Sequence, residues 1–501
     1  MLASPDPGSF ARTYDDGRPQ VVWTDFVADL ETPVSGFLKL ADGKPMSFLL
    51  ESVEGGATRG RYSLIGLKPD LIWRYRDGQA EINRSARVAP HDFEPMGPDG
   101  LGALRRVIEE SRIDLPDSLP PMAAGVFGYL SYDMVRLMER LPDKNPNTLG
   151  IPESIFVRPT IVCVFDNIQD RVTIVTPVWP KPGVDARAAY DQARERLADV
   201  LADLERSVSH RRESMRELEE LPPPSSNMTP DRFKWMVERS KEYIRAGDAF
   251  QVVPSQRFSV PFRLPPFALY RALRRLNPSP FLFFLDLDGF SIVGSSPEIL
   301  VRLRDGTVTI RPLAGTRRRG ANATEDRALA SDLLADPKER AEHLMLLDLG
   351  RNDVGRVSKV GSVRVTEQFA IEYYSHVMHI VSHVEGDISP DYDALSALVA
   401  GFPAGTVSGA PKVRAMEIIE ELEEERRGIY AGCIGYFAAN GTMDTCIALR
   451  TALVKDGTMY VQAGGGIVAD SDPEAEYQET VSKARALFRA AEEAVRFARR
   501  S

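Results

Sequence analysis

Apolar and polar residues alternate over short segments through much of the first half of the chain. Such alternation, bounded by glycine and proline, is typical of strands with one buried face. The pattern predicts strands over 46–52, 61–66, 71–75 and 123–129, and a hairpin over 155–165 and 171–178. Apolar residues at helical spacing predict helices over 34–40, 101–113 and 184–220. Residues 1–20 are polar and rich in proline and glycine, and we expect them to be loose.

The pattern changes after residue 220. A proline-rich segment at 221–228 predicts a linker between an N-terminal domain, 21–220, and a second domain, 229–498. The second domain is predicted to alternate strands with helices: strands over 250–260, 281–304, 307–312, 361–385 and 430–464, and helices over 266–276, 323–352, 391–400, 411–427 and 473–498. Strands joined by short turns are antiparallel, so we expect an α+β fold. The charge run from Glu417 to Arg427 is predicted to be a solvated helix face.

A glycine-rich stretch near the C-terminus is the first candidate for chemistry. Glycines at 464–466 have no Cβ, so another molecule can approach their backbone. An Asp-Pro pair at 472–473 predicts a helix start. Glu476, Glu479 and Lys483 would share one face of that helix. Two carboxylates and an ammonium above a glycine floor suggest a hard cation with an anionic ligand.

Two other interpretations of this stretch compete with a cation site. Acidic residues in a first helical turn commonly just complement the helix dipole. The glycines also fit a loose dinucleotide-binding pattern, but acidic residues at 470 and 472 occupy the helix mouth, where a pyrophosphate needs positive potential. We therefore reject the dinucleotide interpretation.

A second acidic pair, Glu339 and Glu342, lies in the first turns of the helix that Pro337 is predicted to begin. Four carboxylates that converge would repel one another unless a cation joined them. Mg²⁺ prefers oxygen ligands and keeps waters and an open position for a substrate carboxylate. The two pairs together predict a magnesium site.

Composition excludes several classes of protein. The chain has 501 residues, 43% of them hydrophobic and 27% charged, which is ordinary for a globular protein. A net charge of −10 argues against binding nucleic acid. The 3 cysteines lack a paired spacing, which favours a reducing compartment. No signal pattern and no membrane-length apolar run is present, so we expect a cytoplasmic protein that binds no membrane.

Three of the 6 histidines, His376, His379 and His383, lie close together in the sequence. Such a cluster suggests zinc, but in a strand His376 and His379 would point to opposite faces, and no cysteine is spaced to help. An acid–base role for one of them is favoured, because the pKa of histidine lies near working pH.

A series of motifs covering about half of the chain resembles the chorismate-utilising enzymes, in the same order as in that family. They are Gly294-Ser-Ser-Pro-Glu298, Pro312-Leu-Ala-Gly-Thr-Arg317, Asp348-Leu-Gly-Arg-Asn-Asp353, Val377-Met-His379, Phe402-Pro-Ala-Gly-Thr-Val-Ser-Gly-Ala-Pro411 and the stretch from Gly464 to Lys483. Further matches at 49–52, 61–63 and 277–280 resemble, within the family, the chorismate-binding large subunits of anthranilate synthases. The resemblance implies two stacked antiparallel sheets flanked by helices, with the site between them.

The resemblance also implies roles for individual residues. Glu342 and Glu479 would bind Mg²⁺ directly, and Glu339 and Glu476 would hold its waters. Glu298 matches the acid that protonates the departing C4 hydroxyl of chorismate, and His379 matches a histidine associated with pyruvate elimination. The residues that match the substrate pocket are Gly315, Thr316, Thr406, Tyr430, Arg450, Gly464, Gly466 and Lys483.

Two positions discriminate between members of the family. Gln251 stands where the isochorismate and salicylate synthases carry a lysine that activates water, and a neutral amide cannot deprotonate water. Ala314 stands where many aminodeoxychorismate synthases have a lysine. Both positions favour addition of ammonia to give anthranilate and pyruvate. The alternatives that remain are an aminodeoxychorismate synthase component and a catalytically inactive relative that senses tryptophan.

The resemblance further implies regulation and a partner. One set of residues is similar to a feedback site for L-tryptophan, with Phe281-Leu282 in place of the usual Tyr-Met: Glu51, Ser52, Asn277, Pro278, Ser279, Pro280, Phe281, Leu282 and Tyr436. No cysteine lies in the glycine setting of a glutamine-hydrolysing module. We therefore expect a hetero-oligomer in which a glutamine amidotransferase subunit, component II of the synthase, supplies ammonia.

Overall fold

The computed structural model describes residues 3–54, 58–208, 220–374 and 377–500. Its α-helices are α1 Pro7–Asp15, α2 Pro33–Leu40, α3 Gly100–Glu110, α4 Ala186–Glu205, α5 Pro230–Arg245, α6 Pro266–Leu276, α7 Ala323–Ala335, α8 Pro337–Gly355, α9 Ala394–Gly401, α10 Gly405–Ser408, α11 Lys412–Leu422 and α12 Pro473–Arg500. Short 3-10 helices are η1 Pro121–Ala123 and η2 Tyr132–Leu137.

The strands of the first half are β1 Gln20–Val27, β2 Ser47–Glu54, β3 Thr58–Arg76, β4 Gln79–Asn83, β5 Glu94–Gly97, β6 Gly125–Leu130, β7 Ser154–Asp166 and β8 Arg171–Val178. Those that follow are β9 Ser225–Ser226, β10 Gln251–Val252, β11 Ser255–Pro261, β12 Phe281–Leu287, β13 Phe290–Ser296, β14 Ile299–Arg304, β15 Thr307–Ile310, β16 Leu313–Arg318, β17 Arg364–Tyr373, β18 Val377–Asp387, β19 Gly409–Ala410, β20 Cys433–Ala438, β21 Met443–Ile447, β22 Thr451–Lys455 and β23 Thr458–Gly464. Neighbouring strands pair antiparallel, which confirms the predicted α+β class.

Two long bent strands, β3 and β7, join two layers of sheet. Residues 62–67 of β3 pair with β2 and with the end of β7, whereas residues 72–75 pair with β4 and with the start of β7. A register shift near Pro69 and a positive φ of 54° at Lys68 mark the bend. Strands commonly pass from one sheet to another at such bulges. The sequence pattern predicted two separate strands here, because the bend interrupts the alternation.

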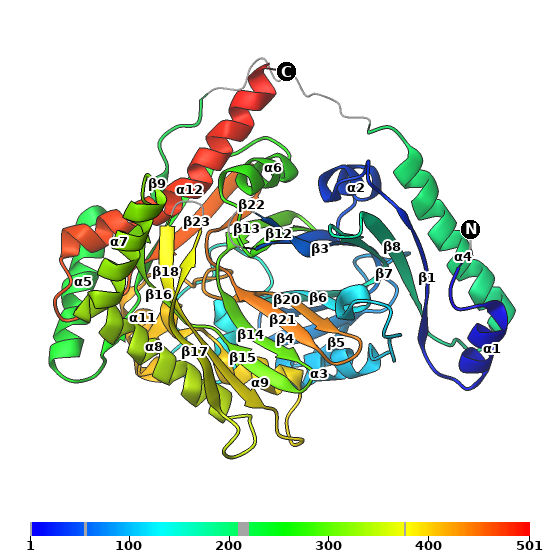
Figure 1. The fold of residues 1–501 in the computed structure, drawn as a ribbon, viewed down its shortest axis with the longest axis horizontal. Coiled ribbons are helices and arrows are strands. Elements are labelled where there is room, and N and C mark those ends of the chain that lie inside the picture. The colour runs from blue at the N-terminus through cyan, green and yellow to red at the C-terminus, as the bar shows by residue number, and fades with distance from the viewer. Residues whose placement is uncertain (1–2, 55–57, 209–219, 375–376, 501) are drawn as a thin grey trace.

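The two layers stack face to face (Figure 1). One runs β11–β23–β22–β13–β12–β2–β3–β7–β8–β1, and the other runs β18–β15–β14–β21–β20–β6–β7–β3–β4–β5. One buried apolar cluster contains Phe48, Phe127, Phe283 and Ile434, which come from strands of both layers. The rings of Phe48 and Phe127 stack with centroids 4.7 Å apart. This cluster is the core between the layers and confirms the predicted stacked sheets.

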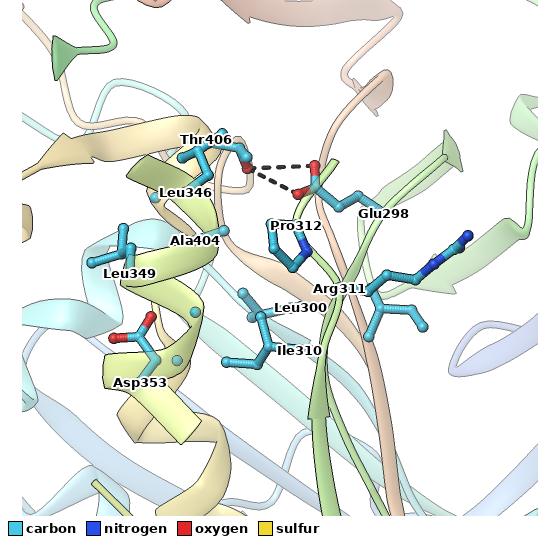
Figure 2. Close-up of a pocket in the computed structure, with 14 residues that line it drawn as sticks. Glu298, Leu300, Ile310, Arg311, Pro312, Leu346, Leu349, Asp353, Ala404 and Thr406 are labelled. Atoms are coloured by element: carbon cyan, nitrogen blue, oxygen red, sulfur yellow. Dashed lines mark hydrogen bonds between the residues drawn. The ribbon is translucent and has the colours of Figure 1, made fainter. Parts of the chain in front are cut away.

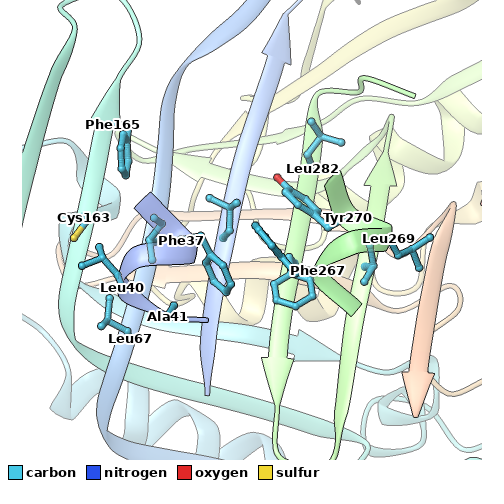
Figure 3. Packing of buried hydrophobic residues seen from close by; sticks show 14 of the residues in the cluster. Phe37, Leu40, Ala41, Leu67, Cys163, Phe165, Phe267, Leu269, Tyr270 and Leu282 are labelled. Atoms are coloured by element: carbon cyan, nitrogen blue, oxygen red, sulfur yellow. The ribbon is translucent and has the colours of Figure 1, made fainter. Parts of the chain in front are cut away.

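Strands from the two predicted domains pair directly with one another. β12 pairs with β2, and β20 pairs with β6. Helices α2 and α6 also meet, with the rings of Phe37 and Phe267 4.5 Å apart on the outer face of the first layer (Figure 3). The sheets therefore do not divide at 221–228, although that segment has only the short strand β9.

The N-terminal residues that the structure describes differ from the expectation of a loose segment. Asp6 caps α1 by accepting hydrogen bonds from the backbone of residues 8 and 9. Phe10 and Tyr14 are buried, and the ring of Phe10 lies 5.0 Å from that of Tyr190 on α4. The expectation of a loose segment was therefore wrong for residues 3–20, because Phe10 and Tyr14 fix this polar segment to the core.

Several helices are shorter than the sequence pattern predicts. Asp336 ends α7 and caps α8, so the predicted helix over 323–352 is two helices. α4 ends at Glu205, and residues 209–219 lie outside the described part of the chain. α11 ends at Leu422 rather than at 427. No helix of the described residues is long and apolar enough to cross a membrane, and Cys163, Cys433 and Cys446 are unpaired.

Candidate active site

Glu298 lies between β13 and β14, where the chain passes from one layer of sheet to the other. Its side chain is buried, and burial raises the pKa of this carboxyl to about 8. The hydroxyl of Thr406, at the start of α10, donates toward the carboxylate over 3.3 Å and 3.4 Å (Figure 2). Glu298 therefore retains its proton at neutral pH, as a general acid must.

A small, partly open hollow borders Glu298 and Thr406. Its walls are mainly apolar side chains of β14, β15 and α8, with Asp353 at the far end from Glu298 (Figure 2). The hollow is not lined by the glycines at 464–466 or by the two predicted carboxylate pairs, Glu339 with Glu342 and Glu476 with Glu479. The hollow therefore reaches Glu298 and Thr406, and Arg311 is among its lining residues, but it does not extend to the other predicted groups.

His379 lies on β18, and its ring nitrogen Nδ1 is 3.0 Å from both the carbonyl oxygen of Gly315 and the hydroxyl of Thr316. A carbonyl only accepts, so Nδ1 carries the proton and Nε2 is left as the acceptor. Burial lowers the pKa of His379 to about 4. Gly315 has φ of +74°, a left-handed conformation that suits glycine, at a bulge in the β16–β18 pairing.

Tyr374, which belongs to none of the family motifs, lies beside His379. The two rings meet edge to face with centroids 5.4 Å apart. The Tyr374 hydroxyl donates to Glu372 over 2.7 Å, and Glu372 also accepts from Arg311. The sequence placed Tyr374 within the strand predicted over 361–385, but a strand prediction does not show where the ring points.

Arg450 and Tyr430 are predicted to hold substrate carboxylates. Burial lowers the pKa of Arg450, while the nearby Tyr374 and Glu298 favour its charged form. Arg450 has φ of +48°, an uncommon conformation for a residue with a side chain, and its carbonyl accepts from the Ser295 backbone over 3.2 Å. Tyr430 is buried, and a Cβ added at Gly464 would lie 2.7 Å from its hydroxyl. A side chain at 464 would therefore displace Tyr430.

The carboxylates predicted to bind Mg²⁺ are engaged by other side chains. Glu339 accepts from Arg317 over 3.0 Å, Glu476 accepts from Ser471 over 2.7 Å, and Glu479 lies 2.6 Å from Lys483. Among the described residues, no three acidic, histidine or cysteine side chains are close enough to hold an ion together. The part of the chain that the structure describes therefore holds no ready-made ion cage, since an arginine, a serine and a lysine contact these carboxylates, and the magnesium site stays a prediction.

The same carboxylates still influence one another. Burial raises the pKa of Glu342, and the charges of Glu339 and Glu479 raise it further. Burial and the charge of Glu479 raise the pKa of Glu476. A cation among these groups would relieve this repulsion, so the donor set fits Mg²⁺.

Gln251 contacts this acidic group directly. Its Nε2 donates to Glu342 over 3.0 Å, and its buried Oε1 has no hydrogen-bond partner among the described residues. A Cβ at Gly466 would lie 2.6 Å from the same Nε2. The absence of a side chain at 466 therefore lets Gln251 reach Glu342.

A family model described as chorismate binding enzyme matches residues 68–489. The chain belongs to this family. It is 61% identical over 493 residues to anthranilate synthase component 1 of Cereibacter sphaeroides, covering 98% of each chain. It is 48% identical over 470 residues to the protein of the same name from Pseudomonas putida, covering 93% of each.

Solved structures of the family agree with this assignment. Anthranilate synthase component I of Streptococcus pneumoniae matches with a TM-score of 0.74 and 39% identity, over 85% of this chain and 92% of that one. The menaquinone-specific isochorismate synthase of Escherichia coli matches with a TM-score of 0.69 at 19% identity, over 97% and 98%. The second likeness shows a shared fold alone.

The residues predicted to bind tryptophan lie mostly in one corner of the family fold. Glu51 pairs with Leu282 across β2 and β12, and it accepts hydrogen bonds from Tyr270 and Arg274 of α6. The loop 277–280 joins α6 to β12, and the hydroxyl of Ser279 within it is buried and unpaired among the described residues. Tyr436 lies on β20 and belongs to the apolar cluster between the layers. Phe281 packs against this cluster.

The alternative zinc interpretation finds no support in the described part of the chain. His376 lies outside the described residues. His379 binds Gly315 and Thr316, whereas His383 accepts from Arg311 over 2.9 Å. These two histidines therefore serve separate hydrogen-bond networks.

Proposed function

We propose that this chain is the chorismate-converting subunit of an anthranilate synthase, a lyase of tryptophan biosynthesis. The observation that carries the proposal is its 61% identity, over 98% of both chains, to an anthranilate synthase component 1. The reaction adds ammonia to chorismate and releases anthranilate, pyruvate and one water. The buried acid, the neutral histidine and the arginine described above fit the steps of that reaction.

In this proposal the substrate is bound by Arg450, Tyr430 and the backbone of the glycines at 464–466. Arg450 presents a planar guanidinium that can grip a carboxylate with two hydrogen bonds. The backbone at Gly464 and Gly466 approaches the substrate without side chains, and Lys483 donates to the Gly464 carbonyl over 3.0 Å, which places its ammonium beside this strand. Thr316 and Gly315 form the wall beside His379.

Glu298 and His379 handle the protons. Ammonia forms a bond to C2 of chorismate as the C4–O bond breaks, and Glu298 gives its proton to the departing oxygen, so that water leaves. The C2 proton and pyruvate are then lost, which makes the ring aromatic. Nε2 of His379 is the free acceptor on that side of the site and is the group we assign to the elimination step.

Mg²⁺ would be held by Glu342 and Glu479, with Glu339 and Glu476 acting through water. When bound, it supplies positive charge opposite the ring carboxylate and stabilises negative charge that develops on the substrate. Gln251 holds Glu342 in position through its amide. Arg317 contacts Oε1 of Glu339 and Lys483 contacts Oε1 of Glu479, so these two cations would compete with the ion for those oxygens.

Ammonia comes, in this proposal, from a glutamine amidotransferase partner, component II, in a cytoplasmic hetero-oligomer. The name component 1 of the relatives implies a second component. L-tryptophan is the proposed feedback inhibitor, in the corner formed by Glu51, Ser52 and residues 277–282. The bonds from Tyr270 and Arg274 to Glu51 fix one wall of that corner.

The test is a direct assay of the purified chain. Chorismate, Mg²⁺ and an ammonium salt should give fluorescent anthranilate, whereas glutamine alone should give none. A non-aromatic amino product would indicate an aminodeoxychorismate synthase. Isochorismate formed without ammonia would indicate a water-using enzyme, and no turnover would leave the inactive relative. Chelation of Mg²⁺ should stop the reaction, and adding the ion back should restore it.

A further inference from the structure

A buried ion pair between Arg427 and Glu423 lies behind the candidate active site. The charge run that contains these residues was predicted to be a solvated helix face, and that prediction was wrong here. The two side chains belong to residues that are only 2% and 5% exposed, because α11 ends at Leu422 and the chain turns inward. Nη2 of Arg427 lies 2.6 Å from Oε1 of Glu423, and Nε lies 3.0 Å from Oε2.

The guanidinium of Arg427 also binds two backbone carbonyls. Nη1 donates to Val407 over 2.8 Å, and Nη2 donates to Val253 over 2.6 Å. Val407 directly follows Thr406, the residue that contacts Glu298. Val253 lies two residues after Gln251. One side chain therefore ties together the segments that carry Thr406 and Gln251.

Glu423 extends the same network to the glycine strand. Its Oε1 accepts from both the backbone and the hydroxyl of Ser255, each over 2.8 Å. Ser255 pairs with Gly464 in the β11–β23 ladder. The carbonyl of Pro254 accepts from the Gly465 backbone over 3.2 Å. The position of the glycine floor therefore depends on where Glu423 lies.

Aromatic rings complete the surroundings of the guanidinium. The Arg427 carbon Cζ lies 4.8 Å from the ring centre of Tyr132 and 5.5 Å from that of Tyr430. A cation above an aromatic face is attracted to it. Arg427 thus also contacts Tyr430, a predicted substrate residue.

We propose that the Arg427–Glu423 pair positions the active site. Its contacts hold Thr406, Gln251, Gly464 and Tyr430 at their places relative to one another. The inference rests on the proposed function, because those four residues gain their roles from it. Arginine suits the task because its rigid planar fork has five donors in fixed directions, whereas lysine has three donors on one flexible ammonium group. A buried ion pair is weak evidence for stability, since apolar residues of similar volume can replace such a pair without loss. The hydrogen bonds of the pair to Val407, Val253 and Ser255 therefore favour a positioning role over a stabilising one.

The test replaces the pair by apolar residues in the double variant Arg427→Met with Glu423→Leu. We expect a folded protein whose kcat/KM for chorismate falls about 10- to 100-fold, since a misplacement of about 1 Å can cost 10²-fold. The chorismate KM should rise, because Tyr430 and Gly464 shift. The alkaline limb of the pH profile should also move, because Thr406 shifts from Glu298. A loss of folded molecules alone would change neither KM nor the pH limb.

Two further variants make the result decisive. Arg427→Lys keeps the charge but not the fork, and it should show the same shifts at smaller size. The matched control is Arg426→Met, since the neighbouring Arg426 binds Asp143 and Glu153 away from the site, and this variant should keep the normal KM and pH limb. Normal kinetics in both Arg427 variants would overturn the inference, and so would unfolding of both. Absence of anthranilate from the unaltered chain would instead refute the proposed function.

Discussion

Glu298 and His379 have exchanged the acid–base properties that their residue types usually show. Burial raises the pKa of the carboxyl to about 8 and lowers the pKa of the imidazole to about 4. At neutral pH the carboxyl holds a proton and the imidazole does not. Environments that push two pKa values apart commonly mark the acid and the base of an active site. The family motifs identify these two residues. They do not show that the pKa of the carboxyl lies above that of the imidazole, because this order depends on burial.

The pH dependence of the reaction should report Glu298. Its proton is present below the folded-state pKa and absent above it, so kcat/KM at constant free ammonia should fall as pH rises through about 8. The hydrogen bond from Thr406 lowers this pKa, so Thr406→Val should move the limb upward. Steady-state rates from pH 6 to 10 measure the effect. The control Thr442→Val, near the turn at 439–440, should leave the alkaline limb of the pH profile unchanged. An unchanged limb in Thr406→Val would contradict the assignment of this limb to Glu298.

Tyr374 should contribute through its hydroxyl. Tyr374→Phe keeps the ring against His379 but removes the bond to Glu372. Because that bond helps to place the ring beside His379, and a misplacement of about 1 Å can cost 10²-fold, we expect kcat/KM to fall roughly 10- to 100-fold. Tyr373→Phe, at the exposed neighbouring residue, is the matched control and should act normally. Equal rates for the two variants would show that the Tyr374 hydroxyl has no role.

At the scale of elements, the proline signals predicted helix starts well. α8 and α12 each begin at the proline that the sequence marks, Pro337 and Pro473, because proline suits the first helical position. Helix ends and partner choice were harder to predict. The charge run after α11 turns inward to bind backbone carbonyls at 253 and 407, and no local pattern shows those distant partners. The four acidic residues were found on the two predicted helices, but their separate contacts to Arg317, Ser471 and Lys483 depend on side-chain placement that sequence does not contain.

The glycine floor between β23 and α12 offers a test at this scale. Gly466→Ala would place a Cβ 2.6 Å from Nε2 of Gln251 and push that amide from Glu342. We expect kcat/KM to fall roughly 10- to 100-fold with a melting temperature close to normal, because the clash falls on one side chain of the site. Gly355→Ala, where the added Cβ meets nothing nearer than 3.9 Å, is the control and should change neither. A normal rate for Gly466→Ala would remove Gln251 from the active arrangement.

At the scale of the whole molecule, the two halves of the chain share their sheets. β2 lies beside β12, β6 lies beside β20, and one core cluster takes residues from both halves. The family resemblance implied stacked sheets, and the proline-rich segment predicted a boundary at 221–228. The sequence could not predict that the sheets cross this boundary, because pairing between distant strands is a property of the fold rather than of any segment.

Separate halves should therefore fail to fold. We expect fragments 1–220 and 229–501, made alone, to lack near-ultraviolet circular dichroism, since each would expose its face of the shared cluster and unpaired strand edges. The intact chain cut once within 221–224 after folding should keep its signal, because that segment carries no paired strand. A native-like spectrum from either fragment alone would contradict the interlocked arrangement.

The pairing of β2 with β12 has a consequence for the newborn polypeptide. β2 leaves the ribosome long before β12 has been translated, and at roughly 5–20 residues per second the wait is on the order of ten seconds or more. Throughout that interval its edge stays open to neighbouring nascent chains. Cells that make much of this enzyme should thus depend on chaperones that shield it until synthesis is finished.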